Sequence, residues 1–291
     1  MEALTVLVTR GDVVEARHVV HVVAVQDGAV VLEAGDPGLV CFLRSSAKPL
    51  QALPLARARP DLTDEQLAIA CSSHLARPEQ LDAVQSLLAA APAGEDELEC
   101  GAEPTRIEHN CSGKHAGMLA LCRARGWESR GYRLAGHPVQ QGCLREIAAA
   151  AEVDPAEIPR AVDGCGVETH ALPLERMALA FANLPGLDGG ARIVTAMRAV
   201  PDFVRGPLGS DAILMRHTEG WTAKGGAEGL MCASGPGGVG VALKVVDGST
   251  RAVRPALHHA LGLLGVDVPE LTPPPVLNSR GEAVGELVTK A

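Results

Sequence analysis

The chain has 291 residues, of which 47% are hydrophobic and only 2% aromatic, so a core would consist mainly of Ala, Val, Leu and Ile side chains. The net charge of −9, the lack of a long basic run and the few aromatic residues exclude nucleic acid as an expected partner. No apolar run approaches the ~18 residues of a membrane span, and the first residues lack a basic and apolar leader. We therefore expect a soluble globular protein in the cytoplasm.

The first 60 residues predict strands followed by a helix. Residues 4–32 alternate between apolar and polar positions, with a turn at Asp27-Gly28, which indicates an antiparallel meander. A short apolar run over 39–43 follows. Pro49 then stands near the start of a predicted helix that ends at about Ala58.

The middle of the chain predicts helices. Thr63 and Gln66 have the spacing of a capping box and place a helix before Cys71. Apolar residues then recur at helical spacing in several segments. These segments are residues 78–91, 118–126, 138–151, 173–184 and 190–200. A strand-like pair at 161–162 leads into a glycine-rich turn over 163–166.

The last 80 residues predict strands again, with one helix at about 255–264. The predicted strands cover residues 213–215, 221–223, 229–233, 239–246 and 284–288. Strands at both ends with helices between them indicate one α+β domain over 1–291. Its sheet part would cover about 1–45 and 210–291, and its helical part about 46–209.

Residues 109–119 (HNCSGKHAGML) bring a thiol, a hydroxyl, an amine and an imidazole together at a predicted helix start. Gly126 follows the helical pattern where a C-terminal helix glycine belongs. Unpaired N–H groups and the positive end of the helix dipole favour a thiolate or an anionic ligand there. A tight glycine-containing turn with a half-buried cysteine is the alternative.

A second candidate site is Ser45-x-x-Lys48. At a helix start the two side chains would share one face, and a neutral lysine could take the serine proton and make the hydroxyl nucleophilic. Lysine has an ordinary pKa of ~10.4, so burial or a neighbouring cation must lower it. A capped, solvated helix start would produce the same pattern.

Two later segments carry matching chemistry. Ser72-Ser73-His74 offers another hydroxyl, and Lys224-Gly225-Gly226 follows a predicted strand. A Ser-x-x-Lys, an auxiliary serine in a helical region and a Lys-x-Gly on a late strand occur in this order in the serine β-lactamase and penicillin-binding group. Alone, Lys224 could equally be an exposed charge at a strand end.

Eight cysteines are scattered singly, and most are expected to be small buried side chains rather than disulfide partners. Cys111, Lys114 and Cys165 form a possible exception. Two thiolates and a neutral amine could hold a soft cation such as Zn²⁺ with one position open, with His115 or Asp163 as an outer contact. Cys-x-x-Lys is not a standard zinc pattern, and purely structural cysteines remain the alternative.

Five segments together resemble the asparaginase II family, the rhizobial-type or class 3 L-asparaginases, and the resemblance extends over nearly the whole chain. These segments are 44–51 (RSSAKPLQ), 71–74 (CSSH), 109–119 (HNCSGKHAGML), 162–167 (VDGCGV) and 224–229 (KGGAEG). The family is similar in fold to serine β-lactamases and glutaminases, hydrolyses L-asparagine to aspartate and ammonia, and binds zinc near its active site.

The resemblance implies a role for each matching residue. Ser45 would be the nucleophile and Lys48 its base, supported by a pair of Ser73 and Lys224. The implied zinc ligands are Cys111, Lys114 and Cys165. The implied substrate contacts and ligand neighbours are Arg44, Asn110, His115 and Asp163. The family also suggests a homodimer.

The chain departs from the family pattern at two places. Residues 75–77 are Leu-Ala-Arg where the family usually has Ser-Gly-Glu, so an auxiliary serine that belonged after His74 would be lost. Glu168 stands where the family usually has proline.

The sequence therefore predicts an L-asparagine amidohydrolase that acts by acyl transfer to serine. Glutamine, a peptide or a β-lactam is the alternative substrate on the same machinery. A hydrolase that uses a metal-bound hydroxide is the mechanistic rival. A non-catalytic protein that binds an amino acid or zinc is the alternative from another class.

Overall fold

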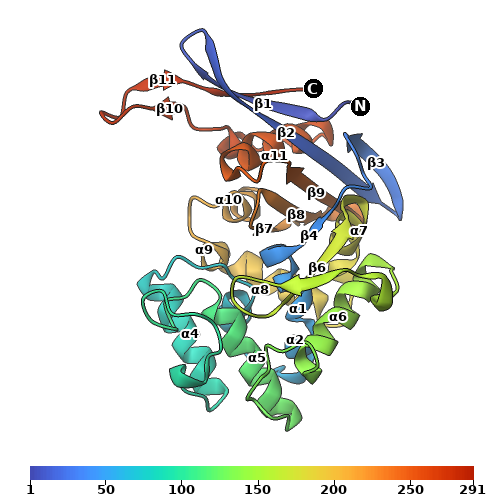
Figure 1. The fold of residues 1–291 in the computed structure, drawn as a ribbon, viewed down its shortest axis with the longest axis vertical. Coiled ribbons are helices and arrows are strands. Elements are labelled where there is room, and N and C mark those ends of the chain that lie inside the picture. Colours follow the sequence, from blue (N-terminus) through green and yellow to red (C-terminus); the bar gives the residue numbers. More distant parts are fainter.

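A seven-stranded antiparallel sheet forms one half of the computed structural model, which describes residues 1–291 (Figure 1). The strand order is β12-β1-β2-β9-β8-β7, with β3 also paired to β2. The strands are β1 (Leu4–Arg10), β2 (Val13–Gln26), β3 (Ala29–Ala34), β7 (Thr222–Gly226), β8 (Leu230–Gly235), β9 (Val239–Val245) and β12 (Leu287–Lys290). Both chain ends lie in this sheet, because Thr5 of β1 is paired with Lys290 of β12.

Helices cover both faces of the sheet. On one face α10 (Ser210–His217) and α11 (Val253–Leu263) bury a cluster of 24 apolar side chains against it. On the other face α7 (Leu174–Asn183) lies against β2 and β9. A Cβ at Gly240 would come within 1.9 Å of the Ala178 carbonyl oxygen, so only glycine allows α7 to approach β9 this closely.

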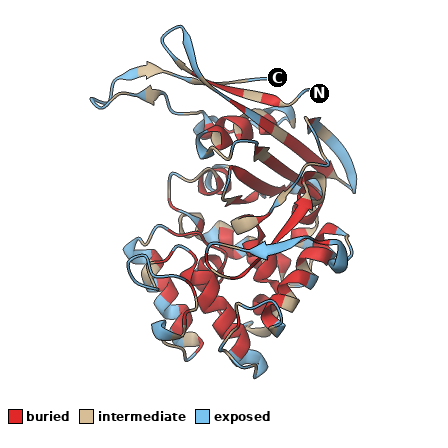
Figure 2. Ribbon diagram, viewed as in Figure 1, coloured by how far each residue is buried: buried red, intermediate tan, exposed pale blue.

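The helical block below the sheet has the larger core, a cluster of 55 buried residues that also includes α7 (Figures 1 and 2). Its other helices are α1 (Lys48–Gln51), α2 (Leu53–Ala58), α3 (Asp64–Ala70), α4 (Pro78–Ala90), α5 (Ser112–Arg125), α6 (Pro138–Ala151), α8 (Gly190–Ala199) and α9 (Pro201–Val204). Figure 2 shows these helices buried on their inward sides and exposed at the periphery. A Cβ at Gly113 would come within 2.2 Å of the Ile69 carbonyl oxygen, so glycine lets the start of α5 lie directly on α3.

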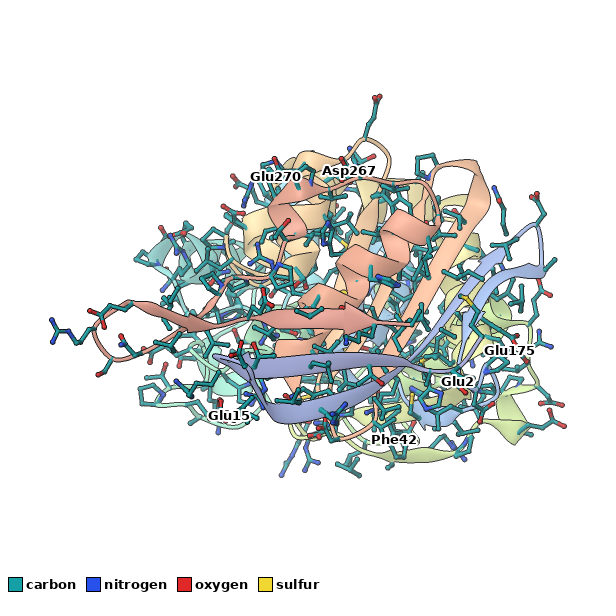
Figure 3. The ribbon with its side chains drawn as sticks, turned by 90° about the horizontal axis from the view of Figure 1, so that it is seen from above. Glu2, Glu15, Phe42, Glu175, Asp267 and Glu270 are labelled. Carbon is teal, nitrogen blue, oxygen red and sulfur yellow. The ribbon has the colours of Figure 1, made fainter.

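Two smaller sheets complete the fold. β4 (Val40–Phe42), β6 (Glu168–Pro173) and β5 (Arg160–Val162) form a three-stranded antiparallel sheet between the main sheet and the helical block, and β10 (Val276–Leu277) pairs with β11 (Ala283–Gly285). Glu2, Glu15 and Asp267 are among the exposed acidic residues on the side of the molecule seen from above (Figure 3).

The predicted α+β architecture is confirmed, with one antiparallel sheet built from both ends of the chain and helices inserted between them. The capping box at Thr63 and Gln66 is also confirmed, with both reciprocal hydrogen bonds present. The strand predicted at 213–215 is wrong, because these residues lie inside helix α10. A short apolar run fits a buried strand and a buried helix equally well. The sequence reading also missed β6.

No helix of the structure is both long enough and apolar enough to span a membrane.

Candidate active site

Ser45 lies where the chain passes from β4 into the helical block. The one-turn 3-10 helix η1 (Arg44–Ala47) carries it and continues directly into α1. Arg44 has a φ of 47°, a left-handed conformation that is uncommon for a residue with a side chain. Ser45 is partly exposed and its hydroxyl makes no hydrogen bond within the protein. The turn therefore presents a hydroxyl that a small molecule can reach.

Ser73 lies between two buried lysines that come from different parts of the chain. The Lys48 and Lys224 ammonium groups each donate a hydrogen bond of 3.1 Å to the Ser73 hydroxyl. Lys48 comes from α1 and Lys224 from β7, the edge strand of the main sheet. The amide of Ser73 is held by the Val204 carbonyl at 2.7 Å. The structure thus joins three of the predicted catalytic residues at the junction of sheet and helical block.

Lys48 does not donate to Ser45, its predicted partner. Its other hydrogen bonds go to the Ser72 carbonyl oxygen and, over 3.2 Å, to the sulfur of Cys111. The segment after His74 that departs from the family pattern turns outward, with Leu75 exposed. The hydroxyl beside the lysines is therefore that of Ser73, before the histidine.

Burial lowers the pKa of Lys224 to about 7, and the positive charges of Lys48 and Arg205 act in the same direction. The Asp211 carboxylate opposes them. Asp211 is fully buried at the start of α10, and its Oδ2 accepts a hydrogen bond of 3.2 Å from the Gly225 amide next to Lys224. Sequence reasoning missed Asp211, because the residue fell beside a segment expected to be a strand.

The second cluster contains Cys111, Lys114 and Cys165. Cys111 is the residue before α5, Lys114 lies in its first turn, and Cys165 lies in the turn between β5 and β6. The Lys114 ammonium donates to the Cys165 sulfur over 3.0 Å. All three side chains are buried. The structure contains no group of three His, Cys, Asp or Glu side chains placed to hold a metal ion, so a metal here would need the lysine as a ligand.

The two thiols of this cluster differ in character. A hydrogen bond from Cys165 holds the pKa of Cys111 well below its usual value despite the opposing effect of burial, and the charges of Lys48 and Lys114 lower it further. The same hydrogen bond and burial raise the pKa of Cys165. Burial acts to lower the pKa of Lys114, but the charges of the two sulfurs outweigh it and raise that pKa. A thiolate is a donor that suits a soft cation, whereas Lys114 could join it as a ligand only as the neutral amine, after losing its proton when the metal binds.

The remaining predicted residues support these clusters in different ways. Arg44 Nε donates to Asp163 Oδ1 over 2.7 Å, which ties the Ser45 turn to the Cys165 turn. The Nδ1 of His115 lies 2.7 Å from the Tyr132 hydroxyl, while its buried Nε2 has no partner. The Asn110 side chain is exposed. The backbone carbonyl oxygen of Asn110 accepts a hydrogen bond of 3.2 Å from the His74 amide.

Glu168, which replaces the usual proline of the family pattern, is the first residue of β6 and pairs with Val162 of β5. It lies in the small sheet rather than in either cluster.

The comparison with protein families matches residues 6–289 to the family described as L-asparaginase II. The chain belongs to this family. It is therefore an amidohydrolase of the asparaginase type. No curated protein matches the chain.

Among solved structures, the chain is similar to the protein Mglu, with 14% identity and a TM-score of 0.51 over 86% of this chain and 68% of that one. A second structure, Mglu in its native form, has 13% identity, a TM-score of 0.48 and coverage of 86% and 65%. A β-lactamase candidate from Bacteroides dorei has 14% identity, a TM-score of 0.44 and coverage of 84% and 93%. The similarity to the first Mglu structure shows the fold of this chain.

Proposed function

We propose that the protein hydrolyses L-asparagine to L-aspartate and ammonia through an acyl-enzyme formed on Ser45. The observation that carries the proposal is the pair of buried lysines that share one serine hydroxyl beside a second, accessible serine. Family membership supplies the substrate class.

Accessibility separates the roles of the two serines. Ser45 is partly exposed, whereas only 5% of the Ser73 surface is exposed and its hydroxyl lies between two lysines. The attacking hydroxyl must meet the substrate, whereas a hydroxyl that only passes protons need not. Ser45 therefore attacks and Ser73 links Lys48 to Lys224.

In the first half-reaction Lys48 first passes a proton through Ser73 to the neutral form of Lys224. As the free amine it then takes the hydroxyl proton of Ser45 while Ser45 Oγ forms a bond to the side-chain amide carbon of asparagine. Backbone N–H groups at the start of η1 are the donors we assign to the oxyanion. The C–N bond then breaks, and ammonia leaves after it receives a proton through Lys48. Because a lysine with a pKa of about 7 exists in both forms near neutral pH, Lys224 can exchange that proton through Ser73.

In the second half-reaction water attacks the ester carbon and the bond to Ser45 Oγ breaks, which releases aspartate. The same lysines accept the proton of the water and return one to Ser45.

We further propose that Cys111, Lys114 and Cys165 hold Zn²⁺. The three side chains converge in a buried cluster, and two sulfurs with the amine of Lys114 fit this ion once the lysine has released its proton on binding. Bound zinc would supply a fixed positive charge beside the active site. The chain's own contribution is the Arg44–Asp163 pair, which holds the turn of Cys165 against the turn of Ser45.

Ammonia release from L-asparagine tests the proposal, with Ser45→Ala and Ser73→Ala compared side by side. We expect Ser45→Ala to lower kcat by about 10³-fold or more, because the nucleophile is lost, and Ser73→Ala to retain part of the activity. Mass spectrometry of protein quenched during turnover should find the acyl group on a peptide that contains Ser45. An adduct on Ser73, or full activity in Ser45→Ala, contradicts the assignment. Faster hydrolysis of glutamine than of asparagine would change the substrate but not the mechanism.

A further inference from the structure

A cleft of about 200 Å³ opens at the end of β7, the strand that carries Lys224. Gly225 and Gly226, which directly follow Lys224, form part of its wall. A Cβ at Gly226 would lie 2.9 Å from the Ser46 hydroxyl, so this wall also packs against the turn that carries Ser45. The cleft is smaller than the ~300–1,000 Å³ pockets that hold drug-sized ligands, which suits an amino acid.

Arg205 lines this cleft, and its side chain is exposed. No acidic side chain of the chain pairs with it. Asp202, the nearest carboxylate in sequence, pairs with Arg216. Asp211, the carboxylate that lines the cleft, accepts hydrogen bonds from the backbone amides of Ala212 and Gly225. The guanidinium is therefore available to an anion from solution.

The backbone that carries Arg205 is fixed relative to Ser73. Ser73 donates its amide hydrogen to the carbonyl of Val204, the residue before Arg205, over 2.7 Å. The buried Gln80 amide group donates to the carbonyls of Asp202 at 3.0 Å and Arg205 at 3.2 Å. Gln80 Oε1 in turn accepts from the Leu75 amide at 2.9 Å. One buried side chain thus ties the segment of Arg205 to the segment of Ser73.

We propose that Arg205 binds the α-carboxylate of the amino-acid substrate and so selects free amino acids. A guanidinium presents two parallel N–H groups to a carboxylate, which gives orientation as well as affinity. The positive charge of Arg205 reaches the catalytic cluster, because it contributes to the lowered pKa of Lys224. This assignment rests on the proposed function and names the group that positions the substrate for it.

The test compares L-asparagine with 3-aminopropanamide, which is asparagine without its α-carboxylate. Steady-state ammonia release gives KM and kcat for asparagine, and competition against asparagine gives the inhibition constant of 3-aminopropanamide. In Arg205→Gln we expect KM for asparagine to rise about 10- to 100-fold, with kcat reduced less and the inhibition constant unchanged. Arg205→Lys should recover part of the loss. Arg17→Gln, which removes an exposed arginine of β2, is the matched control and should change none of these values.

An unchanged KM in Arg205→Gln, or an equal loss for both compounds, overturns the assignment. Thermal unfolding of each variant shows whether the fold is kept. Calorimetric titration of asparagine into Ser45→Ala, with and without Arg205→Gln, gives the same comparison from binding alone. Wild-type protein that binds asparagine but releases no ammonia would overturn the proposed function and leave Arg205 testable by this titration. Absence of asparagine binding would overturn both.

Discussion

Two lysines, Lys224 and Lys114, are buried to nearly the same extent, with 0% and 4% of their surface exposed. Their pKa values nevertheless move in opposite directions. That of Lys224 falls to about 7, whereas that of Lys114 rises. Burial disfavours the charged form in both cases, so the difference comes from the neighbouring charges.

Lys224 donates to a hydroxyl and a carbonyl, which are neutral, and faces another ammonium. The Asp211 carboxylate is the main group that compensates. Lys114 instead contacts the sulfur of Cys165 and lies near the thiolate of Cys111. The neutral form is therefore favoured for the lysine of one cluster and the charged form for the lysine of the other.

Lys48 connects the two clusters, because its ammonium lies 3.1 Å from the Ser73 hydroxyl and 3.2 Å from the Cys111 sulfur. A substitution in either cluster can therefore affect the other cluster through the Lys48 side chain. Substitutions that affect only one cluster test whether the two lysines have different roles.

The largest effect is expected from Lys224→Met. Loss of the proton-exchanging amine should lower kcat about 10²- to 10⁴-fold. In the wild type, Lys224 is protonated below pH 7 and cannot accept a proton, so kcat should rise with pH through about 7. That rise should be absent from the pH profile of Lys224→Met. Lys290→Met, at an exposed position of β12, is the control for loss of a lysine. A variant that keeps the wild-type pH profile would remove Lys224 from the mechanism.

A smaller effect on turnover is expected from Lys114→Met and Cys165→Ser. Each removes one proposed zinc ligand, so protein purified with zinc present should contain much less metal by atomic emission than the wild type. Turnover should fall less than in Lys224→Met, because the Ser-Lys cluster is intact. Cys41→Ser, a half-buried cysteine outside the cluster, should keep its zinc. Full zinc content in Lys114→Met would mean that the two lysines do not divide the roles described above.

Much of the fold was accessible from local patterns. The helix starting at Pro78 and the capping box at Thr63 depend on neighbouring residues, and both appear in the structure as expected. The run at 213–215 was assigned wrongly because a few buried apolar residues have no distinctive period. Strand β6 was missed because its pairing with β4 joins segments about 130 residues apart, which no local pattern encodes.

The same distinction applies to the site. Ser45, Lys48, Cys111 and Lys114 occur in short motifs and could be picked out by their spacing. The contact of Lys48 with Ser73 and Cys111 rather than with Ser45 depends on how α1, the end of α3 and α5 meet. Asp211 carries no motif at all. Its relation to Lys224 arises only because α10 begins beside β7.

Asp211→Asn should give the smallest and most specific change. Asparagine retains one oxygen that can accept the Gly225 amide hydrogen, so the contact of α10 with β7 should persist while the negative charge and the bond from the Ala212 amide are lost. The groups that act on Lys224 are Asp211, which raises its pKa, burial, Lys48 and Arg205, which lower it, and the more distant Cys111, which raises it slightly. Without the Asp211 charge the pKa of Lys224 should fall further. The rise of kcat should therefore move to lower pH by about one pH unit. Because the shift requires Lys224 to be the titrating group, a profile that stays in place or moves to higher pH would assign the rise near pH 7 to another residue.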